Sequence, residues 1–253
     1  MSEKTWKTAI TTSKDGVPQI KGYKLTDLLQ KVTFTRAIFL ILTGELPEPK
    51  QEKMLNAVLV ASIDHGVEAP STTVARITVG DGVPLANAVA AGIGAIGKYH
   101  GGAVEAAAKL FQEAVKNNES ADSIVKQAKE ESRRLPGFGH KVYEVDPRTA
   151  AILEVSQEIG FGGPHTELAT KIEEELNQVS SKKLPLNIDG ITAAVLSDLG
   201  LPWQLGNGFF VIARTVGLVA HVHEELTAEK PVSHRLSEED VLYNGPESRQ
   251  LPK

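Results

Sequence analysis

Apolar residues recur every three or four positions through most of this chain, which is the spacing of helices that bury one face. The spacing is found in stretches that run over 85–96, 104–115, 152–159, 168–179 and 209–226. The alternation typical of strands is confined to the first twenty or so residues, where Asp15-Gly16 supplies the turn signal of a hairpin. The sequence therefore predicts an all-α fold with a short N-terminal β-hairpin.

Composition narrows the class of protein. A chain of 253 residues with 41% hydrophobic residues can bury a large core. Its net charge of -5 supplies no basic field, so we expect neither nucleic acid nor a membrane surface as a partner. The lack of cysteine excludes disulfides, thiolate metal sites and a cysteine nucleophile. We expect a cytoplasmic location, because the first residues lack a signal-peptide core and Arg214 interrupts the longest apolar stretch.

Arg214 lies in the middle of NGFFVIARTVGLVAHVHEEL, which is apolar on nearly every side and predicts a buried helix. An unpaired guanidinium there would cost roughly several kcal/mol, so either a protein carboxylate or a bound anion is needed to neutralise it. His221 falls on the same helix face and is either a neighbour of Arg214 or a core histidine. His221 and His223 point in different directions on a helix, so they form a weak metal-binding pattern.

The segment RRLPGFGHKVYEVDPRTAAIL places several chemically useful residues close together. Residues 136–139 form a turn whose backbone N–H groups can approach a ligand, and His140 follows directly. Asp146 is predicted to cap a helix whose first residue is Pro147, which puts Arg148 in the first turn. Helix N-termini favour acids, so an arginine there indicates either a docked anion or a solvated surface residue.

Asp189 and His65 lie at breaks between apolar stretches. Partial burial would raise the pKa of Asp189 and make it a usable base, whereas as the cap of a helix beginning near Ile191 it would be structural. His65 follows an apolar helix, where a C-terminal cap is the simple interpretation. Several histidines, two arginines and an aspartate at such breaks together favour a pocket for a polyanion.

At these residues the sequence resembles the citrate synthase superfamily. YHGGAVEAAAKLF is similar to the family's HGGANEA segment, and GFGHKVYEVDPR is similar to its GHRVY and DPR segments. IDHGVEAPSTT, NIDG, ARTVG and KGYKLTDLL resemble further family segments, in the family order. The resemblance implies the family's helical fold as a single domain, residues 1–253, in which a smaller subdomain, 102–205, closes on a larger one made of 1–101 and 206–253.

The resemblance also implies roles for individual residues. Asp189 would move the proton at the methyl carbon of acetyl-CoA, and His100 would hydrogen-bond the thioester oxygen. His140 would serve the oxaloacetate carbonyl, which is the C3 hydroxyl of a citryl group. The residues implied to bind substrate are His65, Arg148 and Arg214 for carboxylates, Arg235 as a candidate for the family's C-terminal arginine, and the backbone of Pro136, Gly137, Phe138 and Gly139 for CoA. The resemblance implies no metal and no redox cofactor.

Length and motif details favour one branch of the family. The chain is much shorter than ordinary citrate synthases, and IDHG, NIDGITAAV and NGFFVIARTVG resemble the lyase branch, whereas His100 is a synthase-like feature. We therefore expect a citryl-CoA lyase that cleaves citryl-CoA to acetyl-CoA and oxaloacetate. The alternative is a compact citrate or 2-methylcitrate synthase, and a binding protein without turnover is the remaining class. The resemblance further implies a homo-oligomer, with a separate ligase that supplies citryl-CoA.

Overall fold

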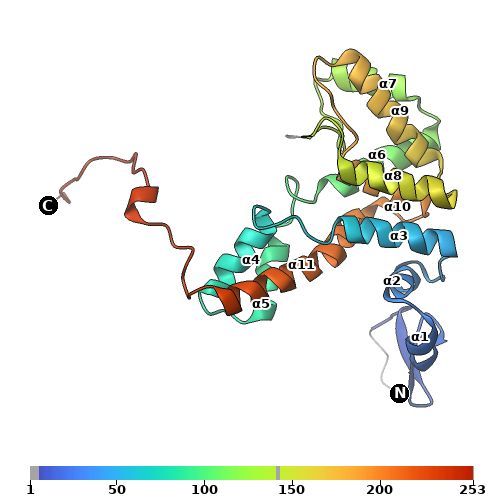
Figure 1. Ribbon diagram of the computed structural model, residues 1–253, viewed down its shortest axis with the longest axis horizontal. Coiled ribbons are helices and arrows are strands. Elements are labelled where there is room, and N and C mark those ends of the chain that lie inside the picture. Colours follow the sequence, from blue (N-terminus) through green and yellow to red (C-terminus); the bar gives the residue numbers. More distant parts are fainter. Residues whose placement is uncertain (1–5, 141–142, 253) are drawn as a thin grey trace.

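Helices dominate the computed structural model, which describes residues 6–140 and 143–252 (Figure 1). The predicted all-α fold with an N-terminal hairpin is confirmed, with a third strand added to the hairpin. Lys141 and Val142 of the motif after His140 lie outside the described residues. In chain order the elements are β1 (Thr11–Lys14), β2 (Val17–Ile20), β3 (Tyr23–Lys24), α1 (Leu25–Lys31), α2 (Phe34–Thr43), α3 (Pro49–Ala61), α4 (Pro70–Gly80), α5 (Leu85–Gly94), α6 (Ala103–Asn117), α7 (Ala121–Glu130), α8 (Pro147–Ile159), α9 (Pro164–Val179), α10 (Ile188–Asp198), the 3₁₀ turn η1 (Trp203–Leu205), α11 (Gly206–Ala228) and the 3₁₀ turn η2 (Glu238–Asp240).

The N-terminal sheet is a small antiparallel meander in the order β1-β2-β3. Lys14 pairs with Val17 across a tight turn, and the two residues between them, Asp15 and Gly16, have φ values of 52° and 75°. Positive φ at both central positions is the backbone of a type I′ hairpin, which glycine adopts at no steric cost. The turn predicted at Asp15-Gly16 is therefore confirmed.

Buried apolar residues form two clusters. The larger is built from α2, α3 and α6 to α10, together with the start of α11. The smaller contains Ala75, Val79, Ala88, Val89, Leu218 and Val222 and joins α4 and α5 to the end of α11. Figure 1 shows α11 running from the main helical body to the α4–α5 pair. The larger cluster joins α2 and α3 to the helices of 102–205, and the subdomain division at 102–205 and its closure stay predictions.

Helix α11 is continuous through Arg214, so the interruption of the apolar stretch at this residue does not end the helix. By length and composition, Trp203–Ala228 could cross a membrane. A core helix meets the same criterion, and α11 contributes Phe209 to the larger cluster and Leu218 to the smaller. Packing within the protein therefore accounts for its apolar sequence.

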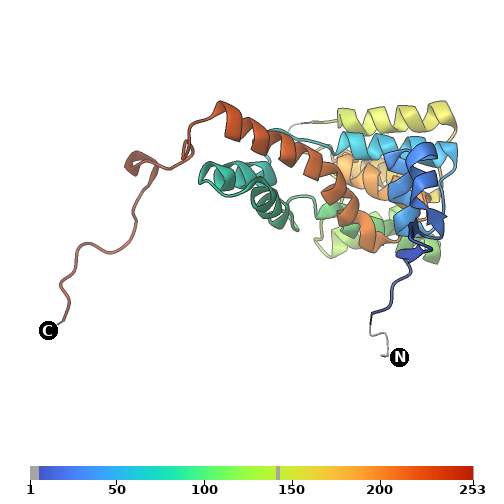
Figure 2. The ribbon, with the colours of Figure 1, turned by 90° about the horizontal axis from the view of Figure 1, so that it is seen from below.

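Beyond α11 the chain leaves the body and extends away from it (Figures 1 and 2). Its only regular element within the described residues is η2. Large apolar side chains on this segment are exposed, namely Leu236, Val241, Leu242, Tyr243 and Leu251. Apolar side chains grouped on a projecting segment are typical of a surface that another chain covers.

Candidate active site

One cavity of about 210 Å³ brings together six of the residues that the sequence singles out. Helices α8, α10 and α11 supply its walls, together with the loops between α3 and α4, between α5 and α6, and between α7 and α8. The cavity is lined by His65, His100, His140, Arg148, Asp189 and Arg214, with Tyr99, Gly101, Asn187, Ile188 and Phe210. Arg235 lies elsewhere: it lines a separate cavity beside Arg76 and His234.

Asp189 lies in the first turn of α10 and is not its cap, so the structural interpretation drawn from the sequence was wrong. The cap is Asn187, whose Oδ1 accepts hydrogen bonds from the backbone N–H groups of Asp189 (3.0 Å) and Gly190 (3.1 Å). Burial raises the pKa of Asp189 above its usual range, although Arg148 and Arg214 oppose the shift. A carboxyl with a raised pKa keeps its proton to a higher pH than an exposed aspartic acid does, which suits a group that takes up and gives back a proton.

The turn that precedes His140 is bonded to the segment that precedes Asp189. The N–H of Gly139 donates to the carbonyl of Pro185 (2.7 Å), and the N–H of Asn187 donates to the carbonyl of Gly137 (3.0 Å). The Asn187 side chain adds a third bond, from Nδ2 to the carbonyl of Gly139 (2.9 Å). These bonds fix the position of His140 relative to Asp189.

Arg148 is held rigidly at the N-terminus of α8, where the predicted cap Asp146 and first residue Pro147 are both confirmed. The fully buried Asp146 carboxylate accepts from Arg148 Nε (3.0 Å) and Nη2 (2.8 Å). Its Oδ2 also accepts from the backbone N–H of Ile188 (3.1 Å), which ties α8 to α10. Burial would raise the pKa of Asp146, but the bonds from Arg148 outweigh it and lower the pKa. Arg148 Nη1 lies 3.4 Å from His65 Nδ1.

Arg214 is 3% exposed, and no carboxylate in residues 6–140 and 143–252 lies within ion-pair distance of it. Its Nε and Nη2 donate to the carbonyl of Ser62 (both 3.3 Å), and its guanidinium lies 4.9 Å from the ring centre of Phe210. Nη1 is buried without a hydrogen-bond partner among the described residues. Of the two partners that the sequence left open, the structure favours a bound anion.

His100 and His65 complete the wall of the cavity. His100 lies in the break between α5 and α6, with Nε2 2.8 Å from Ser71 Oγ and its ring edge-on to Phe210. Burial lowers the pKa of His100, and Arg214 adds to the effect. Burial and then the nearby arginines lower the pKa of His65 as well. Both imidazoles are therefore neutral near pH 7 and can donate hydrogen bonds without adding charge. His65 is not a helix cap, because α3 ends at Ala61.

A second, larger cavity of about 560 Å³ meets the first at His140. Phe138 and Gly139 line it, together with apolar side chains from α7 and α9. Three cations also line it, namely Lys129, Arg133 and Arg134. A small cationic cavity thus adjoins a larger one that is mostly apolar and contains three cations, an arrangement that suits a large anionic ligand.

Sequence reasoning missed Asn187 and the second contact of Asp146. An Asn two residues before Asp189 is a recognisable helix-start signal, so local sequence could have found the first. The bond from Ile188 to Asp146 joins residues 42 positions apart, and no local pattern predicts it. Among the described residues, no group of three or more His, Asp and Glu side chains is arranged to hold a metal ion.

Residues 47–235 match the family described as citrate synthase, C-terminal domain, and the chain therefore belongs to the citrate synthase family. Among solved structures it is similar to citryl-CoA lyase from Hydrogenobacter thermophilus, with a TM-score of 0.96 and 45% identity over 98% of each chain. It is also similar to ATP citrate lyase from Methanothrix soehngenii, with a TM-score of 0.86 and 25% identity over 97% of this chain and 42% of that one.

Curated relatives include citrate synthase 2 of Bacillus subtilis, which is 32% identical over 215 residues, 83% of this chain and 55% of that protein. Citrate synthase of Corynebacterium glutamicum is 34% identical over 220 residues, 81% of this chain and 48% of that protein. The chain thus spans about half the length of the curated relatives it matches.

Proposed function

We propose that the chain is a citryl-CoA lyase, which cleaves citryl-CoA reversibly to acetyl-CoA and oxaloacetate. The observation that carries the proposal is the single cavity in which Asp189 and His140 meet His100 and two arginines. The similarity to a citryl-CoA lyase, which covers 98% of both chains, supports this activity over the alternatives.

In this proposal the arginines bind the carboxylates of the citryl group. Arg214 offers its buried Nη1, which has no hydrogen-bond partner among the described residues, and Arg148 is held in place by Asp146. His65, next to Arg148, adds a neutral donor. Charge-assisted hydrogen bonds from fixed cations orient a carboxylate more strictly than flexible lysines do.

Cleavage then moves two protons and breaks one carbon–carbon bond. His140 takes the proton of the C3 hydroxyl, the C2–C3 bond breaks as the C3 carbonyl forms, and the electron pair passes to the acetyl fragment. His100 hydrogen-bonds the thioester oxygen of the resulting enolate, and protonated Asp189 gives its proton to the methylene carbon. The raised pKa of Asp189 suits this role, since burial favours the protonated carboxyl that gives up its proton in this step. The thioester bond stays intact throughout, and the reverse reaction uses Asp189 as the base.

We assign CoA to the larger cavity. Its apolar walls suit the adenine and pantetheine parts, and Lys129, Arg133 and Arg134 suit the phosphates. The thioester end would then pass the turn of Pro136, Gly137, Phe138 and Gly139 to reach Asp189. No metal and no redox cofactor takes part in the proposed reaction.

The second candidate is a compact citrate or 2-methylcitrate synthase. His100 and the curated relatives named as citrate synthases favour it. The same cavity would serve both activities, and the difference lies in whether water attacks the thioester after the carbon–carbon bond forms. Thiol release therefore distinguishes the two.

The experiment supplies purified protein with synthetic citryl-CoA and, separately, with oxaloacetate plus acetyl-CoA, while oxaloacetate and free thiol are measured independently. A lyase forms oxaloacetate from citryl-CoA without releasing thiol. A synthase releases thiol from the second mixture. Absence of turnover in both mixtures would contradict both enzymatic assignments and favour a protein that binds these compounds without converting them.

We further propose a cytoplasmic homo-oligomer that receives citryl-CoA from a separate ligase. The exposed apolar side chains of the projecting segment 229–252 support association, since such surfaces are usually covered by another chain. In this proposal residues 102–205 close on the rest of the chain when substrate binds, and Arg235 completes a site of the oligomer. Light scattering of wild-type protein, compared with a chain ending after residue 228, tests whether the segment holds the copies together.

A further inference from the structure

The loop between α3 and α4 carries His65 and has no regular structure of its own. Helix α11 holds this loop at three successive turns. Arg214 donates to the carbonyl of Ser62, and the chain of the loop passes so close to Gly217 that an added Cβ would lie 2.5 Å from the carbonyl oxygen of Ile63. The third attachment is a hydrogen bond between His221 and Asp64.

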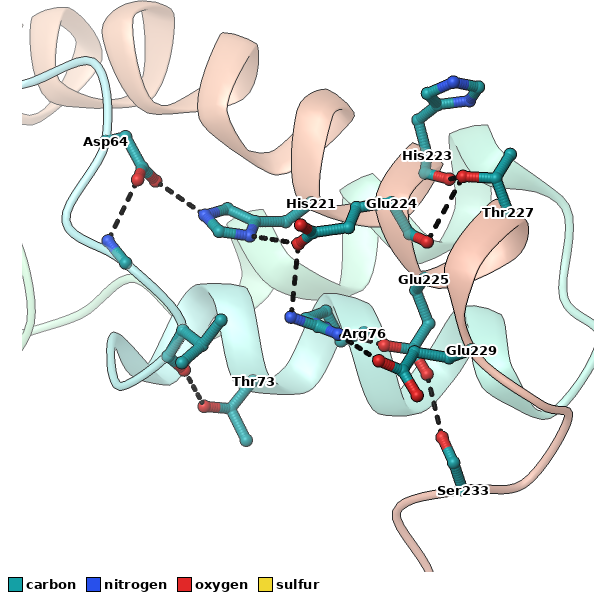
Figure 3. A network of polar contacts seen from close by, with 12 residues as sticks. Asp64, Thr73, Arg76, His221, His223, Glu224, Glu225, Thr227, Glu229 and Ser233 are labelled. Atoms are coloured by element: carbon teal, nitrogen blue, oxygen red, sulfur yellow. Dashed lines mark hydrogen bonds and ion pairs between the residues drawn. The ribbon is translucent and has the colours of Figure 1, made fainter.

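His221 Nε2 lies 3.1 Å from Asp64 Oδ1, one residue before His65 (Figure 3). The other oxygen of Asp64 accepts a hydrogen bond from the backbone N–H of Gly66 (3.0 Å). One carboxylate therefore fixes the backbone on both sides of His65. Burial raises the pKa of Asp64, but the bonds from Gly66 and His221 outweigh it and lower the pKa, so the carboxylate stays charged near neutral pH.

The His221 ring is itself held in one orientation. Its Nδ1 lies 3.6 Å from a carboxylate oxygen of Glu224, which lies 3.4 Å from Arg76 Nη1 (Figure 3). Arg76 is anchored in turn by the buried Glu225, at 2.6 Å. His221 does not line the substrate cavity. His221 lies on the same face of α11 as Arg214, two turns further on, where its side chain contacts Asp64 in the loop that carries His65.

We propose that Asp64 and His221 are positioning residues that hold His65 against Arg148 and so set the affinity for the substrate's carboxylates. This inference rests on the proposed function, because it gives His65 a role in binding the oxaloacetate portion. Disrupting the pair releases the loop but leaves Asp189, His100 and His140 in place. The Kd and KM for oxaloacetate are then expected to rise, while kcat at saturation changes little.

The test compares His221→Leu, Asp64→Ala and the double variant with wild type. Binding of oxaloacetate is measured by calorimetry, and steady-state kinetics are measured with oxaloacetate plus acetyl-CoA. Each single variant is expected to raise the Kd for oxaloacetate about tenfold, and the double variant no further, because both remove one interaction. His221→Gln keeps a side-chain donor and is expected to restore most of the affinity. His223→Ala, on the same helix with an exposed side chain, is the matched control and is expected to bind as wild type does.

Three outcomes overturn the inference: unchanged oxaloacetate affinity in Asp64→Ala, equal losses of kcat and affinity in all variants, or additive effects in the double variant. If His221→Leu fails to fold, the Asp64→Ala variant tests the inference by itself. The Asp64 side chain is 40% exposed and belongs to neither core cluster, so its removal is expected to leave the fold intact. Failure of the proposed function is distinguishable. Wild type that binds oxaloacetate without turnover, and loses this binding in Asp64→Ala, would refute the lyase assignment and leave the positioning pair intact.

Discussion

Gly137 and Gly190 lie in such close contact that neither position has room for a side chain. A Cβ on Gly137 would lie 2.7 Å from the Cα of Gly190, and Gly137 has a φ of +88°, which side-chain-bearing residues rarely adopt. A Cβ on Gly190 would overlap the carbonyl oxygen of Gly137. Gly190 follows Asp189 and Gly137 precedes His140 by three residues, so this contact sets how closely the two approach.

Gly190→Ala is expected to lower kcat/KM for citryl-CoA cleavage and to destabilise the fold by about 1–3 kcal/mol, because backbone must move to admit the methyl group. Gly208→Ala is the control, since nothing lies within 4 Å of that position in α11. It is expected to stabilise the protein by about 0.5–1 kcal/mol through helix propensity. Urea unfolding and initial rates measure both. A Gly190→Ala protein with wild-type stability and rate would refute the tight approach.

Asn187→Ala removes both the cap of α10 and the tether to Gly139. It is expected to cost about 1–2 kcal/mol of stability and to lower kcat more than it raises KM, because His140 and Asp189 lose their fixed spacing. Ser120→Ala removes a cap from α7, whose start lies outside both cavities. It is expected to lower stability while kcat stays at the wild-type value. Equal kcat values for the two variants would show that Asn187 is only a cap.

Neutralising either arginine of the small cavity is expected to weaken binding of the oxaloacetate portion of the substrate and not of its CoA portion. Arg148→Gln or Arg214→Gln should raise the KM for oxaloacetate by about tenfold or more and leave the KM for acetyl-CoA nearly unchanged. Arg134→Gln, in the lining of the larger cavity, should raise the KM for acetyl-CoA and leave the KM for oxaloacetate nearly unchanged. Bisubstrate kinetics in the condensation direction measure both constants. Equal changes in the two KM values for the cavity variants would contradict the assignment of the two cavities.

The raised pKa of Asp189 predicts that this carboxylate costs stability at neutral pH. The pKa of Asp189 in the folded state lies above the ordinary value of 3.8. The protonated carboxyl therefore stabilises the fold below pH 3.8, and this stabilisation is lost as the pH rises through the folded-state pKa. Asp189→Asn is therefore expected to melt at a higher temperature than wild type at pH 7, with the difference closing as the pH falls toward 4.

Asp198 supplies the control of opposite sign. Burial raises its pKa, but hydrogen bonds from His165 and Thr166 outweigh it and lower the pKa. The Asp198 carboxylate therefore stabilises the fold above its ordinary pKa, and this stabilisation is lost on acidification. Asp198→Asn should therefore melt below wild type at pH 7. If Asp189→Asn melts at a lower temperature than wild type at every pH between 4 and 7, ionisation of Asp189 does not destabilise the fold.

Local patterns in the sequence predicted the helices and most of the site residues, because apolar spacing and capping chemistry act over a few residues. The start of α10 was misplaced since Asn187 and Asp189 can both cap a helix, and only packing decides between them. The partner of Arg214 could not be predicted, because the residue that it contacts, Ser62, is 152 positions away. The Ser62 carbonyl accepts from Nε and Nη2 only, and Nη1 has no partner among the described residues. Contacts of this kind are set by the tertiary fold.

In the proposed reaction, Asp189 is the group that exchanges a proton with the acetyl carbon. Single-turnover cleavage of citryl-CoA by Asp189→Asn, with CoA and oxaloacetate binding measured on the same preparation, tests it directly. The predicted result is a loss of at least about 100-fold in the cleavage rate, with both ligands still bound. Cleavage by Asp189→Asn at a rate close to that of wild type would contradict the account.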